Sequence, residues 1–146
     1  MASTVYIFED NQLIRQGLEA ILESDSEYLF CGSAPNGNEW EKIMREKKPD
    51  VILMDIEMPG DDGIALTGKI KQLYPDTKIL IQTVFDDSER IFNALCAGAS
   101  GYILKNDTPT KLLGALSEAM NGGAPMSPSI AKKVIEFFAK TPPAPK

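Results

Sequence analysis

The stretch VILMDIEMPG, residues 51–60, decides how this chain folds. Its first four residues are all apolar, which is typical of a strand buried on both faces of a sheet. Asp55 follows that run directly, and two later apolar runs carry Thr83 and Lys105 at or near their ends. We therefore expect buried strands that deliver polar side chains to one edge of a sheet.

The first apolar run, residues 5–8, ends in Glu9 and Asp10. Neighbouring parallel strands lie about 4.8 Å apart. The carboxylates of Glu9, Asp10 and Asp55 would then converge at the carboxyl edge, where open α/β sheets place their ligands. Three such groups repel one another unless a cation lies between them or their pKa values shift. Because all the available ligand atoms are oxygens, the sequence predicts a Mg²⁺ site.

Composition excludes several classes of protein. The chain has 146 residues, of which 43% are hydrophobic and 25% charged, enough for one domain with a proper core. A net charge of −6 argues against a nucleic-acid surface, so we expect no DNA binding by this chain itself. No apolar run is long enough to span a membrane, and the N-terminus lacks the features of a signal peptide, so we expect a cytoplasmic protein.

Histidine is absent from the chain. Its absence excludes Ser-His-Asp and Cys-His catalysis, a histidine general base and any zinc site with a histidine ligand. The chemistry must rest on carboxylates, a lysine and hydroxyl groups.

Helical and strand signals alternate along the chain with short polar connections, which predicts a doubly wound parallel α/β sheet of five strands. The expected strands are 5–8, 28–32, 51–55, 78–83 and 101–105. The expected helices include residues 38–46, 62–74 and 88–97, one opening at Thr108-Pro109, and an extra C-terminal helix from Ser127-Pro128. We expect the apolar residues of that last helix to pack on the domain or on a second copy, and residues 141–146 to form a Pro-rich linker or tail.

With these features, the sequence resembles the receiver domain of two-component response regulators, of the NarL/FixJ type. The resemblance covers about residues 4–123 and implies a flavodoxin-like fold with strand order 2-1-3-4-5. Residues 1–123 would be the receiver domain and residues 124–146 the extra helix and tail, with an output domain outside this chain. The residues that carry the resemblance follow the predicted strands. They are Glu9 and Asp10 after the first strand, Asp55 with Met58-Pro59-Gly60 and Gly63 after the third, and Thr83 after the fourth. The stretch AGASGYILK, residues 97–105, adds Tyr102 and Lys105.

The resemblance implies a role for each of these residues. Asp55 would accept a phosphoryl group from a partner histidine kinase or a small phosphodonor. Glu9, Asp10, Asp55 and the backbone carbonyl of Glu57 would hold Mg²⁺, and Lys105 would contact the phosphoryl oxygens. The chain would thus be a regulatory phosphoacceptor that assists its own phosphorylation and dephosphorylation, and not a classical enzyme.

The resemblance also implies a conformational switch. Thr83 would turn toward the phosphoryl group and draw its loop along, and Tyr102 would move inward with it. Phe85, two residues past Thr83, is interpreted as ordinary apolar loop surface. The changed surface would control an output domain for transcription regulation. A cognate sensor histidine kinase would be the partner that supplies the phosphoryl group. A homodimer is a further expected possibility.

Three other functions are compatible with an α/β sheet of this kind. A flavodoxin-like enzyme would need a phosphate-binding loop after the first strand, where acids stand here. An aspartyl-phosphate phosphohydrolase usually carries its nucleophile on the first strand. A stand-alone or pseudo-receiver acting as a protein-interaction module is the serious rival, and phosphorylation by acetyl phosphate would discriminate.

Overall fold

Five parallel strands form the central sheet in the order β2-β1-β3-β6-β7. Counted along the chain as strands of this sheet, that is the predicted order 2-1-3-4-5, and the α/β class is confirmed. The computed structural model describes residues 2–106 and 108–140. The strands are β1 (Ser3–Phe8), β2 (Tyr28–Ala34), β3 (Val51–Met54), β6 (Lys78–Thr83) and β7 (Gly101–Leu104).

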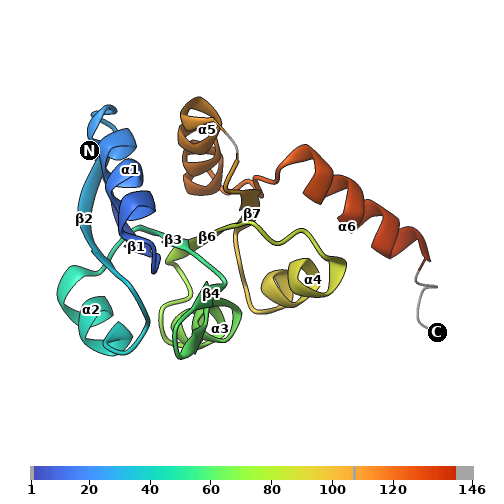
Figure 1. Cartoon of the computed structure of the whole chain (residues 1–146), viewed down its shortest axis with the longest axis horizontal. Coiled ribbons are helices and arrows are strands. Elements are labelled where there is room, and N and C mark those ends of the chain that lie inside the picture. The colour runs from blue at the N-terminus through green and yellow to red at the C-terminus, as the bar shows by residue number, and fades with distance from the viewer. Residues whose placement is uncertain (1, 107, 141–146) are drawn as a thin grey trace.

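Helices cover both faces of the sheet (Figure 1). On one face lie α1 (Gln12–Glu23) and α5 (Pro109–Met120), and on the other lie α2 (Trp40–Lys47), α3 (Gly63–Leu73) and α4 (Ser88–Cys96). Asn11, Asp62, Asp87 and Thr108 cap α1, α3, α4 and α5, each accepting a backbone N–H of the first turn. Among the described helices, none is both long and apolar enough to cross a membrane.

The strands alternate between the two layers of the core. In β1, Val5 and Ile7 pack with the cluster under α1 and α5, whereas Tyr6 and Phe8 pack with the cluster under α2, α3 and α4. All four of these side chains are buried, as expected for a strand covered on both faces. The apolar runs of the sequence are therefore continuous because both faces of the sheet are buried.

Helix α2 begins two residues later than predicted, at Trp40 instead of Asn38. The N–H of Asn38 donates to the side chain of Asn36, and the N–H of Trp40 donates to the carbonyl of Gly37, so a turn occupies these residues. The helix ends in a left-handed residue, Lys48, with φ of 44°. Local side-chain hydrogen bonds thus compete with the first turn of the helix.

A two-stranded hairpin, absent from the sequence-based prediction, follows β3. It pairs β4 (Glu57–Met58) with β5 (Asp61–Asp62) in antiparallel fashion. Gly60 in its turn has φ of 75°, a conformation that favours glycine. The hairpin brings Gly63 against the backbone of Asp55, so close that an added Cβ would lie 1.9 Å from the Asp55 carbonyl oxygen. Gly63 is therefore required by a close approach of two backbones beside the candidate site.

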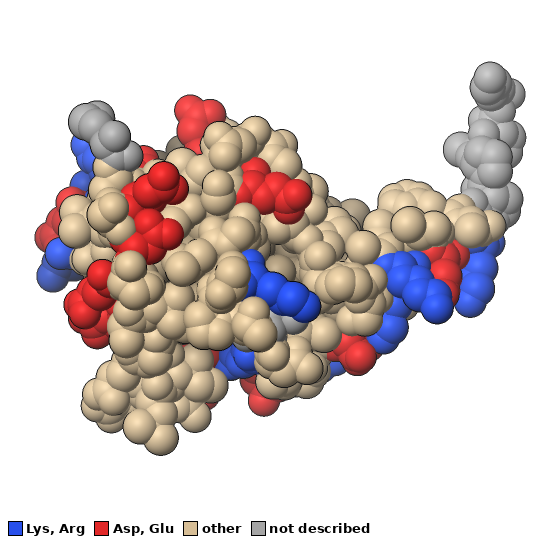
Figure 2. Space-filling model, turned by 90° about the horizontal axis from the view of Figure 1, so that it is seen from above, with Lys and Arg blue, Asp and Glu red and all other residues tan. Residues whose placement is uncertain are grey.

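The extra C-terminal helix is α6 (Pro128–Lys140), which extends past α4 at one end of the molecule (Figure 1). Ile130 is fully buried and Val134 packs against the core, whereas Ile135 and Phe138 remain exposed. The expectation that these residues pack on the domain is thus met by only some of them. Lysine side chains gather on this projecting helix (Figure 2). The predicted tail, residues 141–146, lies outside the described residues.

Candidate functional site

Three carboxylates meet at the carboxyl edge of the sheet. Strands β1 and β3 pair so that Phe8 lies opposite Met54, and the residues that follow these strands are therefore neighbours. Glu9, Asp10 and Asp55 each offer a carboxylate oxygen within 4.8 Å of the others. Glu9 and Asp55 are buried, with 2% and 6% of their surface exposed, while Asp10 is exposed. The three carboxylates therefore lie together at the sheet edge, as predicted from the sequence.

Lys105 lies between the two buried acids. Its Nζ is 2.5 Å from Oε1 of Glu9 and 3.0 Å from Oδ2 of Asp55. The residue directly follows β7, and its N–H donates to the carbonyl of Thr83 on the neighbouring strand. One ammonium group therefore bridges two buried carboxylates at the same sheet edge, as expected when the ends of three parallel strands converge.

Burial and hydrogen bonding shift the pKa values of Glu9 and Lys105. Desolvation raises the pKa of Glu9 to about 7, although the Lys105 ammonium and the N–H of Asn11 both act to lower it. Burial acts to lower the pKa of Lys105, but hydrogen bonds to Glu9 and Asp55 outweigh it, so the net pKa is raised. Lys105 is therefore a permanent cation at neutral pH, while Glu9 can exchange a proton close to pH 7.

The donor set suits a hard divalent cation. Glu9, Asp10 and Asp55 provide oxygen atoms alone, and their three potential charges exceed the single charge of Lys105. Oxygen ligands and excess negative charge are what Mg²⁺ or Ca²⁺ require. Glu57 lies in β4 with its side chain exposed. Its expected contribution is a backbone carbonyl, and that ligand remains a prediction.

The two expected switch residues lie on adjacent strands and are both fully buried. The Oγ1 of Thr83 accepts the N–H of Phe85 at 3.4 Å, and the hydroxyl of Tyr102 donates to the Phe85 carbonyl at 2.7 Å. The guanidinium of Arg90 lies 4.2 Å from the centre of the Phe85 ring. The interpretation of Phe85 as ordinary loop surface is therefore wrong, because its backbone joins Thr83 to Tyr102 and its half-buried ring packs against the core.

Arg15 belongs to the site but was not among the residues predicted from the sequence. From the first turns of α1, its Nη1 donates to the carbonyl of Glu9 at 2.6 Å and to that of Asp10 at 3.1 Å. These bonds hold the backbone of the acidic loop while both carboxylates face the site. A basic residue five positions after an acidic pair was the available signal, but only the path of the loop gives it meaning.

The acidic pocket, its bridging lysine and the buried Thr-Tyr pair can be compared with known proteins. Residues 5–117 match the family model of the response regulator receiver domain. The chain belongs to this family. Its resemblance to receivers of the NarL/FixJ type, inferred from the motifs around Asp55 and Lys105, is thereby confirmed.

Relatives place this receiver domain among response regulators of the LuxR and NarL type. A LuxR-family two-component response regulator from Aurantimonas sp. SI85-9A1 is 31% identical, with a TM-score of 0.89 over 96% of this chain and 100% of its own. The transcriptional regulatory protein YxjL of Bacillus subtilis is 36% identical over 138 residues, which are 93% of this chain and 63% of YxjL. The oxygen regulatory protein NreC of Staphylococcus carnosus is 36% identical over 136 residues, 92% of this chain and 62% of NreC.

The receiver domain thus spans somewhat less than two thirds of the length of these curated relatives. Receivers of this family serve phosphorylation-dependent signalling and are regulatory proteins, not classical enzymes.

Proposed function

We propose that Asp55 is the phosphoacceptor of this receiver domain. The observation that carries the proposal is the placement of Lys105, whose ammonium contacts Asp55 and Glu9 at the carboxyl edge of the sheet. A buried carboxylate beside a fixed cation is held in one orientation and remains a nucleophile. Asp55 combines a buried position, a strand end and neighbouring acids.

In the reaction, an oxygen of the Asp55 carboxylate attacks the phosphorus of the donor, and the bond from phosphorus to the donor's nitrogen or oxygen breaks. Since the chain contains no histidine, a phosphohistidine donor must belong to a partner, which we take to be a sensor histidine kinase. Lys105 then exchanges its contact with Asp55 for a phosphoryl oxygen, acting as a point charge. Its second contact, with Glu9, keeps it at the site throughout.

We propose Mg²⁺ as the cofactor, held by Glu9, Asp10, Asp55 and the backbone carbonyl of Glu57. The bound ion would offset the repulsion between the carboxylates and stabilise the charge on the transferring phosphoryl oxygens. The clustering of the three carboxylates, of which Lys105 contacts only Glu9 and Asp55, supports this assignment. Arg15 would contribute by fixing the backbone that carries Glu9 and Asp10.

Thr83 and Tyr102 are proposed to report the phosphorylation. Once Asp55 carries a phosphoryl group, the Thr83 hydroxyl gains a new partner and gives up its contact with Phe85. Because Tyr102 binds the carbonyl of the same Phe85, a shift of this loop reaches β7 and the adjacent surface of α4. A single loop therefore couples both switch residues.

For the whole protein, we propose transcription regulation through an output domain beyond this chain. The names of the relatives as regulatory proteins, and the part of their length that this chain does not span, support the proposal. Residues 1–123 would form the receiver and residues 124–146 the helix and linker toward the output. A homodimer stays open, and DNA contact would be a property of the output domain.

Labelling by acetyl phosphate tests the function. The wild-type chain should gain one phosphoryl group with Mg²⁺ present, an Asp55→Asn variant should gain none, and an Asp76→Asn variant, altered at an exposed acid, should match wild type. Intact-protein mass spectrometry counts the groups. Labelling of Asp55→Asn at the wild-type level would refute the proposal, and a wild-type chain that never labels would favour an unphosphorylated interaction module.

A further inference from the structure

Helix α6 begins against the strand that carries Tyr102. Met126 forms a parallel bridge with Tyr102, and the N–H of Leu104 donates to Oγ of Ser127 at 2.9 Å. In the first turn of the helix, Ile130 is fully buried in the core. The start of α6 is therefore fixed to β7 and cannot leave the domain without breaking these contacts.

Lys133 reaches from α6 to the loop that follows β6. Its Nζ donates to the backbone carbonyl of Asp86 at 2.6 Å and lies 3.3 Å from the carboxylate of the same residue. Asp86 stands three residues past Thr83, in the loop of residues 84–87 between β6 and α4. Helix α6 thus contacts the loop of one proposed switch residue and the strand of the other.

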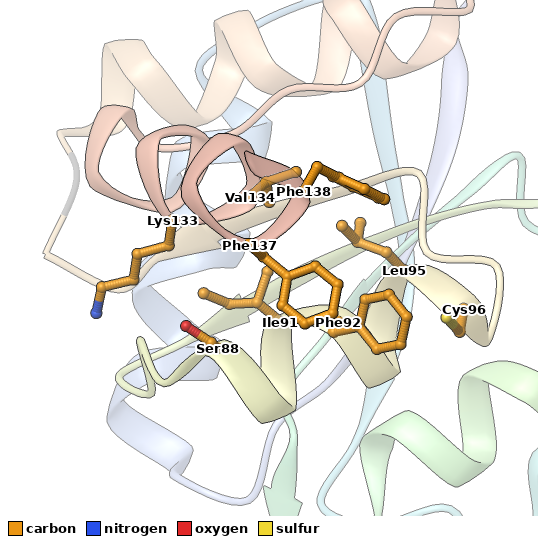
Figure 3. A pocket seen from close by; sticks show the side chains of 9 residues that line it. All are labelled: Ser88, Ile91, Phe92, Leu95, Cys96, Lys133, Val134, Phe137 and Phe138. Atoms are coloured by element: carbon orange, nitrogen blue, oxygen red, sulfur yellow. The ribbon is translucent and has the colours of Figure 1, made fainter. Parts of the chain in front are cut away.

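The end of α6 packs on α4. The ring of Phe137 lies 4.6 Å from that of Phe92, centre to centre, and Figure 3 shows the two rings side by side. In the same view Lys133 extends away from this aromatic contact, toward the start of α4 (Figure 3). The charged contact and the aromatic contact are therefore separate, and the first can be removed without touching the second.

The loop of residues 84–87 is consequently held from two sides. Inside the domain, Phe85 binds Thr83 through its N–H and Tyr102 through its carbonyl. Outside, Lys133 holds Asp86. If Thr83 turns to a phosphoryl group, its bond to Phe85 is lost and the loop must shift. Asp86 can move with the loop only if its contacts with Lys133 break or if α6 moves as well.

We propose that Lys133 and Asp86 form a latch through which α6 restrains the phosphorylated conformation, so that phosphorylation of Asp55 loosens the C-terminal half of α6. The latch rests on the proposed function of Asp55 and Thr83. Coupling between two sites is reciprocal. If phosphorylation weakens the contact between Lys133 and Asp86 by some factor, loss of that contact raises the affinity of the phosphoryl site by the same factor. Residues that follow α6 in a longer protein would thereby receive the signal directly.

Beryllofluoride, a non-covalent stand-in for the phosphoryl group, tests the latch with Mg²⁺ present. Lys133→Met keeps the length of the side chain and removes the charge and the donors. Lys132→Met is the matched control, because Lys132 is exposed on the same helix and its loss changes the net charge equally. By calorimetric titration, K133M should bind beryllofluoride about fivefold more tightly than K132M, at the low end of typical coupling. Asp86→Asn tests the other half, and its effect should not add to that of K133M.

Hydrogen exchange supplies the reciprocal measurement. On adding beryllofluoride to the wild-type chain, the amides of residues 134–140 should exchange faster, whereas in K133M they should be fast from the start. Equal affinity of K133M and K132M, weaker binding by K133M, or unchanged exchange in wild type would each overturn the latch while leaving the proposed function intact. A wild-type chain that binds no beryllofluoride would overturn both.

Discussion

The hydroxyl of Tyr102 on β7 donates a 2.7 Å hydrogen bond to the backbone carbonyl of Phe85 in the loop after β6. Burial raises the pKa of this tyrosine further above its ordinary value, with the nearby carboxylate of Asp87 acting in the same direction. The group therefore stays protonated and remains a donor throughout the physiological range. This single bond ties the strand next to Lys105 to the loop next to Thr83.

Replacing Tyr102 with phenylalanine removes this bond and leaves a carbonyl without its partner. We expect the free energy of unfolding to fall by about 1 kcal/mol, measured by urea denaturation at pH 7. Tyr74→Phe is the control, because its half-buried ring makes no hydroxyl hydrogen bond within the described residues. Labelling of Asp55 by acetyl phosphate should persist in Tyr102→Phe. Equal losses of stability in the two variants would show that the bond contributes nothing.

Thr83→Ala should accept a phosphoryl group but fail to transmit it. The hydroxyl of Thr83 contacts Phe85 and supplies no nucleophile. In NMR spectra, beryllofluoride with Mg²⁺ should shift the signals of Tyr102 in the wild-type chain and leave them nearly unchanged in the variant. A variant with the full wild-type response would separate Thr83 from the switch.

Asp10→Ala should abolish Mg²⁺-dependent labelling without unfolding the protein. Asp10 is exposed, so its removal costs little packing, whereas its carboxylate is one of the two that lie close to the carboxylate of Asp55. The free energy of unfolding, measured by thermal melting without metal, should be within about 0.5 kcal/mol of the wild-type value. Normal labelling would make Asp10 a surface acid with no role at the site.

The pKa of Glu9 predicts how stability depends on pH in the metal-free protein. Its folded pKa of about 7 lies above the ordinary value of 4.5, so the folded state binds this proton more tightly than the unfolded state. The resulting stabilisation is fully present below pH 4.5 and is lost as pH rises through 7.

With EDTA present, the free energy of unfolding of the wild-type chain should therefore fall by roughly 2 kcal/mol more than that of Glu9→Gln between pH 5 and about pH 8. Urea denaturation at several pH values measures both proteins. Parallel profiles would mean that Lys105 keeps Glu9 ionised across this range.

Within α6, truncation of two isoleucines should lower the free energy of unfolding by very different amounts. Ile130 is 0% exposed and Ile135 is 70% exposed. Ile130→Ala should lower the free energy of unfolding by about 2–5 kcal/mol, and Ile135→Ala should change it by no more than about 0.5 kcal/mol. Urea denaturation checks both. If Ile130→Ala were as mild as Ile135→Ala, α6 would not be part of the folded core.

Much of the fold followed from local pattern. The apolar runs that end at Phe8, Met54 and Ile81 mark strands, because a strand covered on both faces needs no polar alternation. The edge at which Glu9 and Asp55 meet also followed, because parallel strands present their carboxyl ends together. The sequence by itself therefore determined the fold class, the family and the acidic pocket.

Other features depended on tertiary structure. Arg15, Gly63 and Lys133 have roles only because separate segments meet: a side chain crosses to a loop, two backbones touch, or a helix lies against α4. Phe85 looked like loop surface because no local pattern reveals that Tyr102, 17 residues away, binds its carbonyl. Periodicity reports which face of an element is buried, but contacts between elements are set by how the loops and helices pack, and only the three-dimensional structure decides them.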